Sequence, residues 1–231
     1  STRFNIAVPR SKLVRFDGLE SSTFADRYVI GEPLTIVKLY HSLGVDPETG
    51  MYRFEDYNGD GEISSTDDRE WVEDLAPRFY GGLGNTLTWG NLTLDVFLQF
   101  KKQRAYNTVR FNATPGYSGN ASVELYDRWQ EPGDITSFQR ASAGLVIGGN
   151  SADTQQRRSS AAVSDASFIR VRNISLNYKV PNLDNGLDIN VYLQGQNLFT
   201  LTDYKGPDPE QTANTRLPQL RQLTLGLQVG F

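Results

Sequence analysis

The last nine residues alternate strictly between apolar side chains and small or polar ones, and this pattern constrains the fold more than any other feature. The odd positions hold Leu223, Leu225, Leu227, Val229 and Phe231. A period of two is that of a β-strand, whose successive side chains point to opposite faces. We therefore predict a strand with one apolar and one polar face. Counted back to residue 217, the segment exceeds the roughly 9–11 residues that a tilted strand needs to cross a bilayer.

Five further segments carry strand patterns with an apolar face. They are residues 3–8, 79–89, 91–101, 168–180 and 187–196. In the segment 168–180 the parity of the apolar positions changes near Arg172 and Asn173, which predicts a β-bulge. The chain is therefore expected to be all-β, with about six strands that each present one apolar face.

The connections between these strands alternate between short and long. Trp89-Gly90-Asn91 and residues 181–186 are predicted tight turns, whereas residues 9–78, 102–165 and 200–216 form longer connections. Short turns on one side and long extracellular loops on the other are typical of an antiparallel transmembrane β-barrel. The strand directions then place the end of the chain on the periplasmic side of a bacterial outer membrane.

A soluble β-sandwich gives the same alternation, because each of its sheets buries one face on the other. Two features favour the barrel. The polar faces carry Gln, Asn, Asp and Lys, as a water-filled lumen would, and Tyr80, Trp89, Tyr178 and Tyr192 lie near predicted strand ends, where aromatic girdles occur.

Six strands are too few for a closed bacterial barrel, since the smallest have about eight. An open sheet in lipid would leave unpaired backbone groups that cost several kcal/mol each. We therefore expect residues 1–231 to be the C-terminal portion of a larger barrel, as a processed, split or partial product whose other strands lie in further polypeptide.

Composition excludes several classes of function. The 231 residues include no cysteine, which excludes disulfides, thiol catalysis and cysteine zinc sites. No run of about 18 apolar residues offers a transmembrane helix. The chain has no concentrated basic face, so we expect no nucleic-acid partner. His41 is the single histidine, and no catalytic constellation surrounds it in the sequence, so we expect a loop residue there and no enzymatic activity.

Acidic residues concentrate between Asp46 and Asp74, a segment with 11 acidic and only two basic side chains. Within this segment, residues 56–67 have the spacing of a calcium loop. The expected ligands are Asp56, Asn58 and Asp60 at loop positions one, three and five, the backbone carbonyl of Glu62 at seven, a water held by Ser64 at nine, and Asp67 at twelve.

Hard oxygen ligands suit Ca²⁺, and Gly61 at loop position six permits the sharp turn. Asp67 departs from the glutamate usual at position twelve, and a shorter carboxylate that binds through one oxygen would lower the affinity. A bound calcium ion would stiffen the long loop rather than catalyse a reaction. The alternative is an acidic turn whose side chains cap their own backbone.

Several segments, in order along the chain, resemble one family of transporters. They are GEPL at 31–34, DPETG at 46–50, the acidic loop at 56–68, APRFYGG at 76–82, SDASFIRVRNI at 164–174, QNLFTLTDYKGPDPE at 196–210 and LPQLR at 217–221. With these segments the chain resembles the C-terminal part of a SusC/RagA-type TonB-dependent outer-membrane transporter of Bacteroidota. The terminal Phe231 resembles the outer-membrane assembly signal of such barrels.

The resemblance implies a barrel of about 22 strands whose lumen is closed by an N-terminal plug. Residues 1–231 would lack the plug and the segment that contacts TonB. The implied partners are the remaining barrel and plug polypeptide, a SusD-like surface lipoprotein that closes the mouth as a lid, TonB, membrane lipid, and an oligosaccharide or peptide cargo.

In such a barrel, polar side chains would line a wet lumen, namely Asp95, Gln99, Asn190, Gln194 and Gln228. The aromatic loop residues Tyr117, Tyr126 and Trp129 would either stack on sugar rings or pack the loops. The alternative function is that of a soluble or surface-attached calcium-binding β-module with an adhesive or glycan-binding role.

Overall fold

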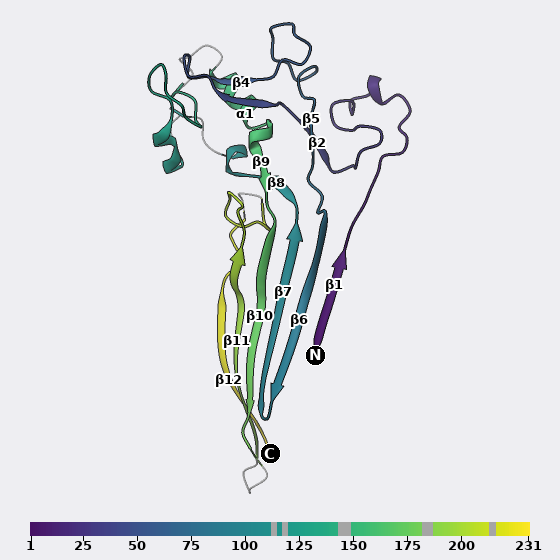
Figure 1. Cartoon of the computed structure of the whole chain (residues 1–231), viewed down its shortest axis with the longest axis vertical. Coiled ribbons are helices and arrows are strands. Elements are labelled where there is room, and N and C mark those ends of the chain that lie inside the picture. The colour runs from purple at the N-terminus through teal and green to yellow at the C-terminus, as the bar shows by residue number, and fades with distance from the viewer. Residues whose placement is uncertain (112–114, 117–119, 143–148, 182–186, 213–215) are drawn as a thin grey trace.

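The computed structural model describes residues 1–111, 115–116, 120–142, 149–181, 187–212 and 216–231. One antiparallel six-stranded sheet dominates it, with the strand order β1-β6-β7-β10-β11-β12 (Figure 1). The strands are β1 (Thr2–Ala7), β6 (Phe79–Trp89), β7 (Leu92–Lys102), β10 (Phe168–Lys179), β11 (Asp188–Leu201) and β12 (Gln222–Gly230). Each of the six predicted strands is present, and the all-β antiparallel prediction is confirmed.

The smaller elements gather at one end of the sheet, which we call the loop end (Figure 1). Three two-stranded sheets pair β2 (Ile36–Leu39) with β5 (Trp71–Asp74), β3 (Ser42–Val45) with β4 (Tyr52–Phe54), and β8 (Arg104–Tyr106) with β9 (Val163–Asp165). The helical elements are η1 (Leu19–Ser21), η2 (Thr108–Arg110), η3 (Val123–Asp127), α1 (Gly149–Gln156) and η4 (Ser160–Ala162). The predicted long connections are thus folded locally, because short strand pairs satisfy their backbone groups.

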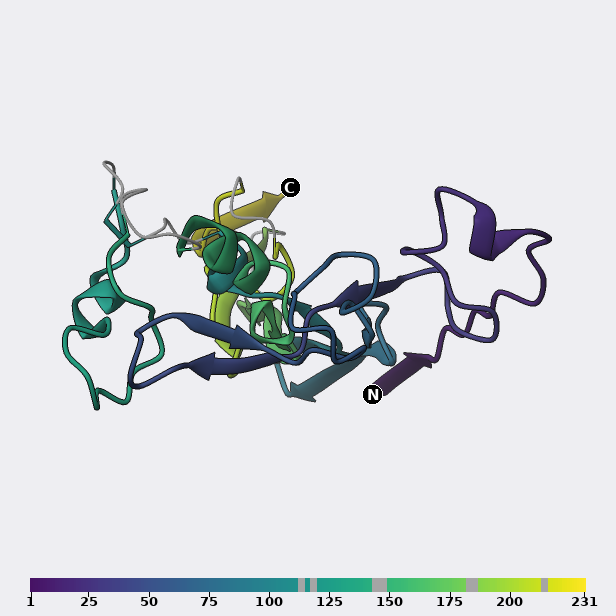
Figure 2. The ribbon, with the colours of Figure 1, turned by 90° about the horizontal axis from the view of Figure 1, so that it is seen from above.

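Seen from above, the segments around η1 and η3 project from the sheet in opposite directions (Figure 2). Among the described residues, no helix is long and apolar enough to cross a membrane.

The opposite end of the sheet, which we call the turn end, contains the predicted turn between β6 and β7. Trp89 pairs with Leu92 across it, and Gly90 adopts the left-handed backbone (φ 57°) that a two-residue hairpin turn requires. The second predicted turn, at residues 181–186, falls on residues 182–186, which lie outside the described part of the chain.

The predicted β-bulge is confirmed in β10. The pairing register of β10 shifts between Val171 and Asn173 against both of its neighbours, β7 and β11. Asn197 of β11, near this shift, has left-handed backbone (φ 51°), the one non-glycine residue of the described chain that does. The bulge resets the alternation, so that Arg170 before it and Ser175 after it face the same side.

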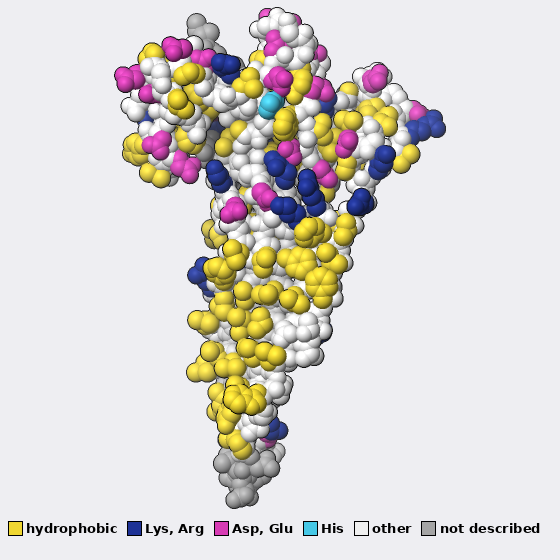
Figure 3. Space-filling model, in the orientation of Figure 1, with side chains coloured by type: hydrophobic (Ala, Val, Ile, Leu, Met, Phe, Trp, Pro, Cys, Tyr) yellow, Lys and Arg dark blue, Asp and Glu magenta, His cyan; other side chains and the backbone are white. Residues whose placement is uncertain are grey.

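The sheet has one apolar face, which we call the outer face. Register places Leu176 between Leu94 and Leu193, and Leu193 in turn beside Leu225, which is 76% exposed. Apolar side chains cover this face along the strands, whereas charged side chains concentrate at the loop end (Figure 3). No second sheet covers the outer face within the described residues, so the β-sandwich alternative is wrong.

The opposite, inner face is mainly polar. Ser175 lies between Asp95 and Gln194, Gln99 lies beside Arg170, and Asn190 pairs with Gln228. All five residues predicted to line a lumen therefore share this one face.

The aromatic side chains near strand ends divide between the two faces. Trp89, 86% exposed, and Tyr178 lie on the outer face at the turn end, as a girdle would. Tyr80, at the loop end of β6, and Tyr192 were also expected in aromatic girdles, but strand parity puts them on the inner face, where the ring of Tyr192 lies over Gly226. A methyl group on Gly226 would approach this ring to 2.1 Å, so the pair requires glycine.

An aromatic cluster that the sequence analysis did not single out lies on the outer face toward the loop end. The ring of Phe100 stacks on Phe4 with centroids 5.9 Å apart, and Phe79 lies 6.3 Å from the same ring. These rings lie on the face and near the end of the strands where an aromatic girdle of a barrel would lie.

The two faces predict opposite responses to a charge in the middle of β10. In the complete barrel, Leu176→Arg should destabilise the fold by about 2–4 kcal/mol, because a cation would face lipid near the midplane. The matched variant Ser175→Arg places the cation on the inner face beside Asp95 and should cost much less. The measurement is urea unfolding in lipid vesicles, followed by heat-modifiable gel mobility. Equal costs would contradict the assignment of faces.

Candidate functional site

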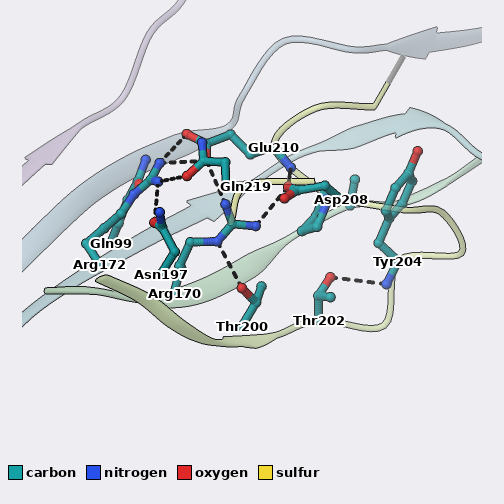
Figure 4. A network of polar contacts seen from close by, with 12 residues as sticks. Gln99, Arg170, Arg172, Asn197, Thr200, Thr202, Tyr204, Asp208, Glu210 and Gln219 are labelled. Carbon is teal, nitrogen blue, oxygen red and sulfur yellow. Dashed lines mark hydrogen bonds and ion pairs between the residues drawn. The ribbon is translucent and has the colours of Figure 1, made fainter. Parts of the chain in front are cut away.

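Two arginines of β10 project from the inner face and organise the polar contacts at the loop end. Strand parity directs Arg170 inward beside Gln99, and Arg172 follows on the same side immediately before the parity resets. Figure 4 shows both guanidinium groups pointing toward the segment that joins β11 to β12. We call this segment, as far as residues 202–212 and 216–221 describe it, the strap.

Arg170 is almost fully buried, with 3% of its surface exposed. Its Nη2 donates to Asp208 Oδ1 at 2.8 Å, and its Nη1 donates to Glu210 Oε2 at 3.0 Å. The Nε donates to Thr200 Oγ1 of β11 at 2.9 Å. Asp208 is 4% exposed, so this ion pair is shielded from water on both sides.

Arg172 binds the same strap from a second position. Its Nη2 donates to both carboxylate oxygens of Glu210, at 2.6 Å to Oε2. Its other nitrogens donate to Gln99 of β7, Asn197 of β11 and Gln219 of the strap. Every nitrogen of this guanidinium group is therefore engaged, and the contacts join two strands to both arms of the strap.

The network carries two positive and two negative groups and is neutral as a whole. Burial by itself raises the pKa of Asp208, but the hydrogen bonds from Arg170 and from the backbone N–H of Glu210 lower it by more. The pKa of Asp208 therefore lies below its ordinary value, and the carboxylate stays charged at neutral pH. Removing one partner of a buried ion pair is strongly destabilising, because the other charge is left without compensation.

The strap is also held against the sheet and β8 along its length, by side-chain hydrogen bonds to backbone carbonyl groups. Gln103 Nε2 donates to Pro209 O at 2.7 Å, and Tyr204 Oη donates to Tyr106 O at 2.6 Å. At the start of the strap, Thr202 Oγ1 donates to Ser167 O at 2.7 Å. The strap therefore lies against the ends of β7 and β10 and against β8.

A cleft of about 1420 Å³ opens beside the strap at the loop end. Strap residues 205–207 line one side of it, and residues 134–138 line another. Tyr126 also borders the cleft and is largely exposed. This cleft is large enough for a short oligomeric ligand.

Of the three aromatic loop residues in the sequence analysis, Trp129 serves to pack the loops. It is buried, its Nε1 donates to Pro47 O at 2.7 Å, and its ring lies against Gly50. Gly50 has positive φ (69°) and leaves no room for a Cβ. Tyr126 is available to a ligand, and Tyr117 lies outside the described residues.

The predicted calcium loop brings Asp56, Asn58 and Asp60 together in one tight turn. Asp56 accepts hydrogen bonds from the backbone N–H groups of Gly59 and Gly61 at 2.7 and 2.8 Å. Gly61 has the left-handed backbone (φ 82°) that position six requires. The backbone N–H of Glu62 and the side chain of Asn58 donate to Asp60 and lower its pKa below the ordinary value.

Asp67 has a different partner, since its carboxylate accepts a hydrogen bond from Ser64 Oγ at 2.9 Å. The adjacent Asp68 was not a predicted ligand, yet it is fully buried and accepts from the N–H groups of Tyr57 and Ser64. It closes the loop at its base. Its contact to Ser64, four residues earlier, follows a local pattern, whereas its contact to Tyr57 spans 11 residues and depends on the fold of the loop.

In the described part of the chain, no three His, Cys, Asp or Glu side chains group closely enough to hold a metal ion. The backbone hydrogen bonds to Asp56 and Asp60 are those that the self-capping alternative requires. Each carboxylate oxygen still has a second lone pair, and oxygen donors suit Ca²⁺. Calcium binding by this loop therefore stays a prediction.

His41, the single histidine, lies in the loop region, as expected. Its Nδ1 lies 2.7 Å from Glu55 Oε2, and its ring stacks on Trp71 with centroids 4.5 Å apart. These contacts give His41 a structural role in packing the loop region.

Arg170, Arg172, Asp208 and Glu210 lie in segments that resemble the transporter family, but their sequence alone assigned them no role. The available signal was a pair of arginines at alternate positions of a predicted membrane strand, since charges there are costly without partners. The Asp-Pro-Glu tripeptide at 208–210 supplies two matching carboxylates.

Comparison with known proteins decides the family. TonB-dependent receptor P3 of Formosa agariphila is 29% identical over 209 residues, which is 82% of this chain and 20% of that protein. TonB-dependent receptor P26 of the same organism is 31% identical over 207 residues, 80% of this chain and 20% of the relative. The chain belongs to the TonB-dependent receptors. It spans about a fifth of the length of these curated relatives, and no family model matches it.

Solved structures confirm the fold of this receptor segment. The RagAB peptide importer in its open-open state superposes with a TM-score of 0.78 at 22% identity, covering 100% of this chain and 26% of that one. Its closed-closed state gives 0.77 at 23% identity, with 100% and 27% coverage. The prediction of a transmembrane β-barrel segment is confirmed in its fold. The relatives are receptors rather than enzymes, in agreement with the expected absence of enzymatic activity.

We expect calcium binding to depend on Asp60. In the full receptor, Asp60→Ala should weaken calcium affinity by about tenfold or more, because charge count and ligand number set the affinity of such loops. Isothermal titration with CaCl₂ measures this. The control is Asp134→Ala, since Asp134 accepts two backbone hydrogen bonds in the same manner but lies in another loop. Equal calcium binding by the wild type and Asp60→Ala would leave only the self-capping role.

The lowered pKa of Asp208 predicts an acid-sensitive strap. In the unfolded chain an aspartate carboxyl has a pKa of about 3.9. Because the folded pKa is lower, the stability it contributes is complete above that value and is lost as pH falls through the folded pKa. Thermal unfolding of the receptor from pH 7 to 2 should show a smaller acid-induced fall for Asp208→Asn than for the wild type. The exposed strap residue Asp203 offers the control, Asp203→Asn, which should follow the wild-type profile.

Proposed function

We propose that this receptor segment forms part of an outer-membrane importer for oligosaccharides or peptides that is energised through TonB. The observation that supports this function most is the pairing of a lipid-facing outer face with an inner face on which buried ion pairs hold a strap beside an open cleft. A soluble binding module rarely exposes a continuous apolar surface of this extent to water.

The orientation follows from the two ends of the sheet. Long connections of barrel proteins face the exterior and short turns face the periplasm. The loop end would then face the medium, with the cleft at the mouth of the barrel, and residue 231 would lie on the periplasmic side. A SusD-like lipoprotein would close over the loop end as a lid.

The two edge strands indicate where the remaining receptor attaches. β1 and β12 stand at the two ends of the strand order, so each has one edge without a strand partner among the described residues. In lipid such edges cost several kcal/mol for each unpaired group. Further strands of the same receptor would pair with both edges and close the barrel around the plug, which carries the contact to TonB.

The cargo class is supported by the cleft and by the solved relatives. Tyr126 offers an exposed ring at the cleft, which suits stacking on a sugar or packing on a peptide side chain. The structural relatives are described as peptide importers. Both cargo classes are polar oligomers too large for passive diffusion, so both call for an energised importer.

The experiment is deletion of the receptor gene in its own host, with uptake of a fluorescent oligosaccharide mixture and a fluorescent peptide mixture as readouts. Uptake of one mixture should fall by about tenfold or more and return on complementation. Removing the proton gradient that powers TonB should have the same effect in the wild type. Unchanged uptake of both mixtures would contradict the import proposal.

The alternative, a calcium-binding adhesive module, makes a separate prediction in the same strains. Such a module would leave the membrane fraction in a carbonate wash, whereas a barrel would need detergent for release. Retention until detergent is added, together with cargo uptake, would exclude the module.

A further inference from the structure

We propose that the strap is a fixed wall of the cargo cleft, held in place by Arg170 and Arg172, and that it stays in position while cargo enters. This inference rests on the proposed import function and specifies which part of the mouth does not move. The arginines act as positioning residues, because they contact the strap and not the cleft.

The first support is the burial of the ion pairs. Arg170 and Asp208 are nearly inaccessible to water, and Glu210 receives hydrogen bonds from both arginines. Lifting the strap would separate these charges and leave both guanidinium groups on β10 without their carboxylate partners. Breaking a buried pair in this manner is strongly unfavourable, so the closed arrangement is the stable one.

The second support is the spread of the fastenings. Thr202 fixes the beginning of the strap to Ser167, and Asn197 Nδ2 donates to Leu220 O at 3.3 Å near its end. Between them, the backbone N–H of Thr108 donates to Lys205 O at 3.1 Å. A segment that swings on a hinge has few contacts along its length, and this one is held at its start, middle and end.

The third support is the stiffness of the strap itself. Pro207, Pro209 and Pro218 restrict its backbone, which lowers the entropy lost on ordering. The ring of Tyr204 folds under Gly206, where a Cβ would come within 2.3 Å of the ring. The turn at 204–207 is therefore preformed on the side of the strap that faces the cleft.

The position of the strap makes its rigidity relevant to import. Residues 205–207 line the cleft, and Lys205 is exposed there. A fixed wall would keep the cleft preorganised for cargo, whatever the lid does, and preorganisation lowers the entropic cost of binding. Loss of the arginine contacts would let the strap move, so the cleft would no longer hold one shape for the cargo.

The first test measures the strap directly by trypsin cleavage after Lys205 in the purified full receptor. Arg172→Ala should accelerate this cleavage by about tenfold or more, because proteolysis follows the population of the opened segment. The control is Lys179→Ala, which removes an ion pair to Asp188 at the turn end of the same two strands and should leave cleavage unchanged. If Arg172→Ala fails to assemble, Arg172→Lys keeps the charge, loses the forked contact and should show an intermediate rate.

The second test asks whether the strap must move. The 231 residues contain no cysteine, and the backbone N–H of Thr108 donates to Lys205 O at 3.1 Å, so Thr108→Cys with Lys205→Cys places two thiols on neighbouring backbone segments. The gel mobility of the non-reduced protein shows whether the disulfide has formed. Oxidised receptor should import cargo within about twofold of the reduced form if the strap is a fixed wall. Each single-cysteine variant controls for the lost side chain.

The outcomes separate the two proposals. Import that stops on oxidation and returns with reductant would overturn the fixed wall, as would unchanged trypsin cleavage in Arg172→Ala. A wild-type receptor that imports neither cargo mixture would contradict the import function, while the cleavage rates would still decide whether the arginines hold the strap.

Discussion

In the hydrocarbon of a membrane, each backbone N–H and C=O must find its partner in a neighbouring strand, and this requirement governs the whole structure. It explains why six long strands form one antiparallel sheet and why the irregular and short-stranded parts gather at one end. It also determines the alternation of apolar and polar side chains along each strand. Once the backbone is paired, alternate residues must suit lipid on one face and a polar interior on the other.

The β-bulge in β10 shows how the chain keeps this alternation over a long strand. Without the register shift after Val171, the inward series through Arg170 and Arg172 would continue to Ile174. The shift returns Ile174 to the outer face and brings Ser175 inward. A single extra residue thus keeps apolar side chains toward lipid on both halves of the strand, and the polar interior gains the arginine pair.

The sequence could predict what depends on near neighbours along the chain. The six strands, the turn at Gly90 and the bulge all follow from local periodicity, and all are present. The strap network could not be predicted, because Arg170 finds Asp208 at a separation of 38 residues and Gln103 finds Pro209 at 106. The calcium loop is an intermediate case. Its turn and left-handed Gly61 were local and correct, whereas the burial of Asp68 beneath it depends on packing that no spacing rule contains.

The choice of arginine in the strap network follows from geometry. Arg172 alone meets acceptors from β7, β11 and both arms of the strap, through a planar group whose donors point in fixed directions. A lysine carries the same charge but cannot address four acceptors spread around a plane. The guanidinium group of Arg172 therefore holds the strap through hydrogen bonds of fixed direction as well as through its charge. Specificity for cargo is left to the exposed residues of the loop end, such as Tyr126 and Lys205, whose replacement would not disturb the barrel beneath them.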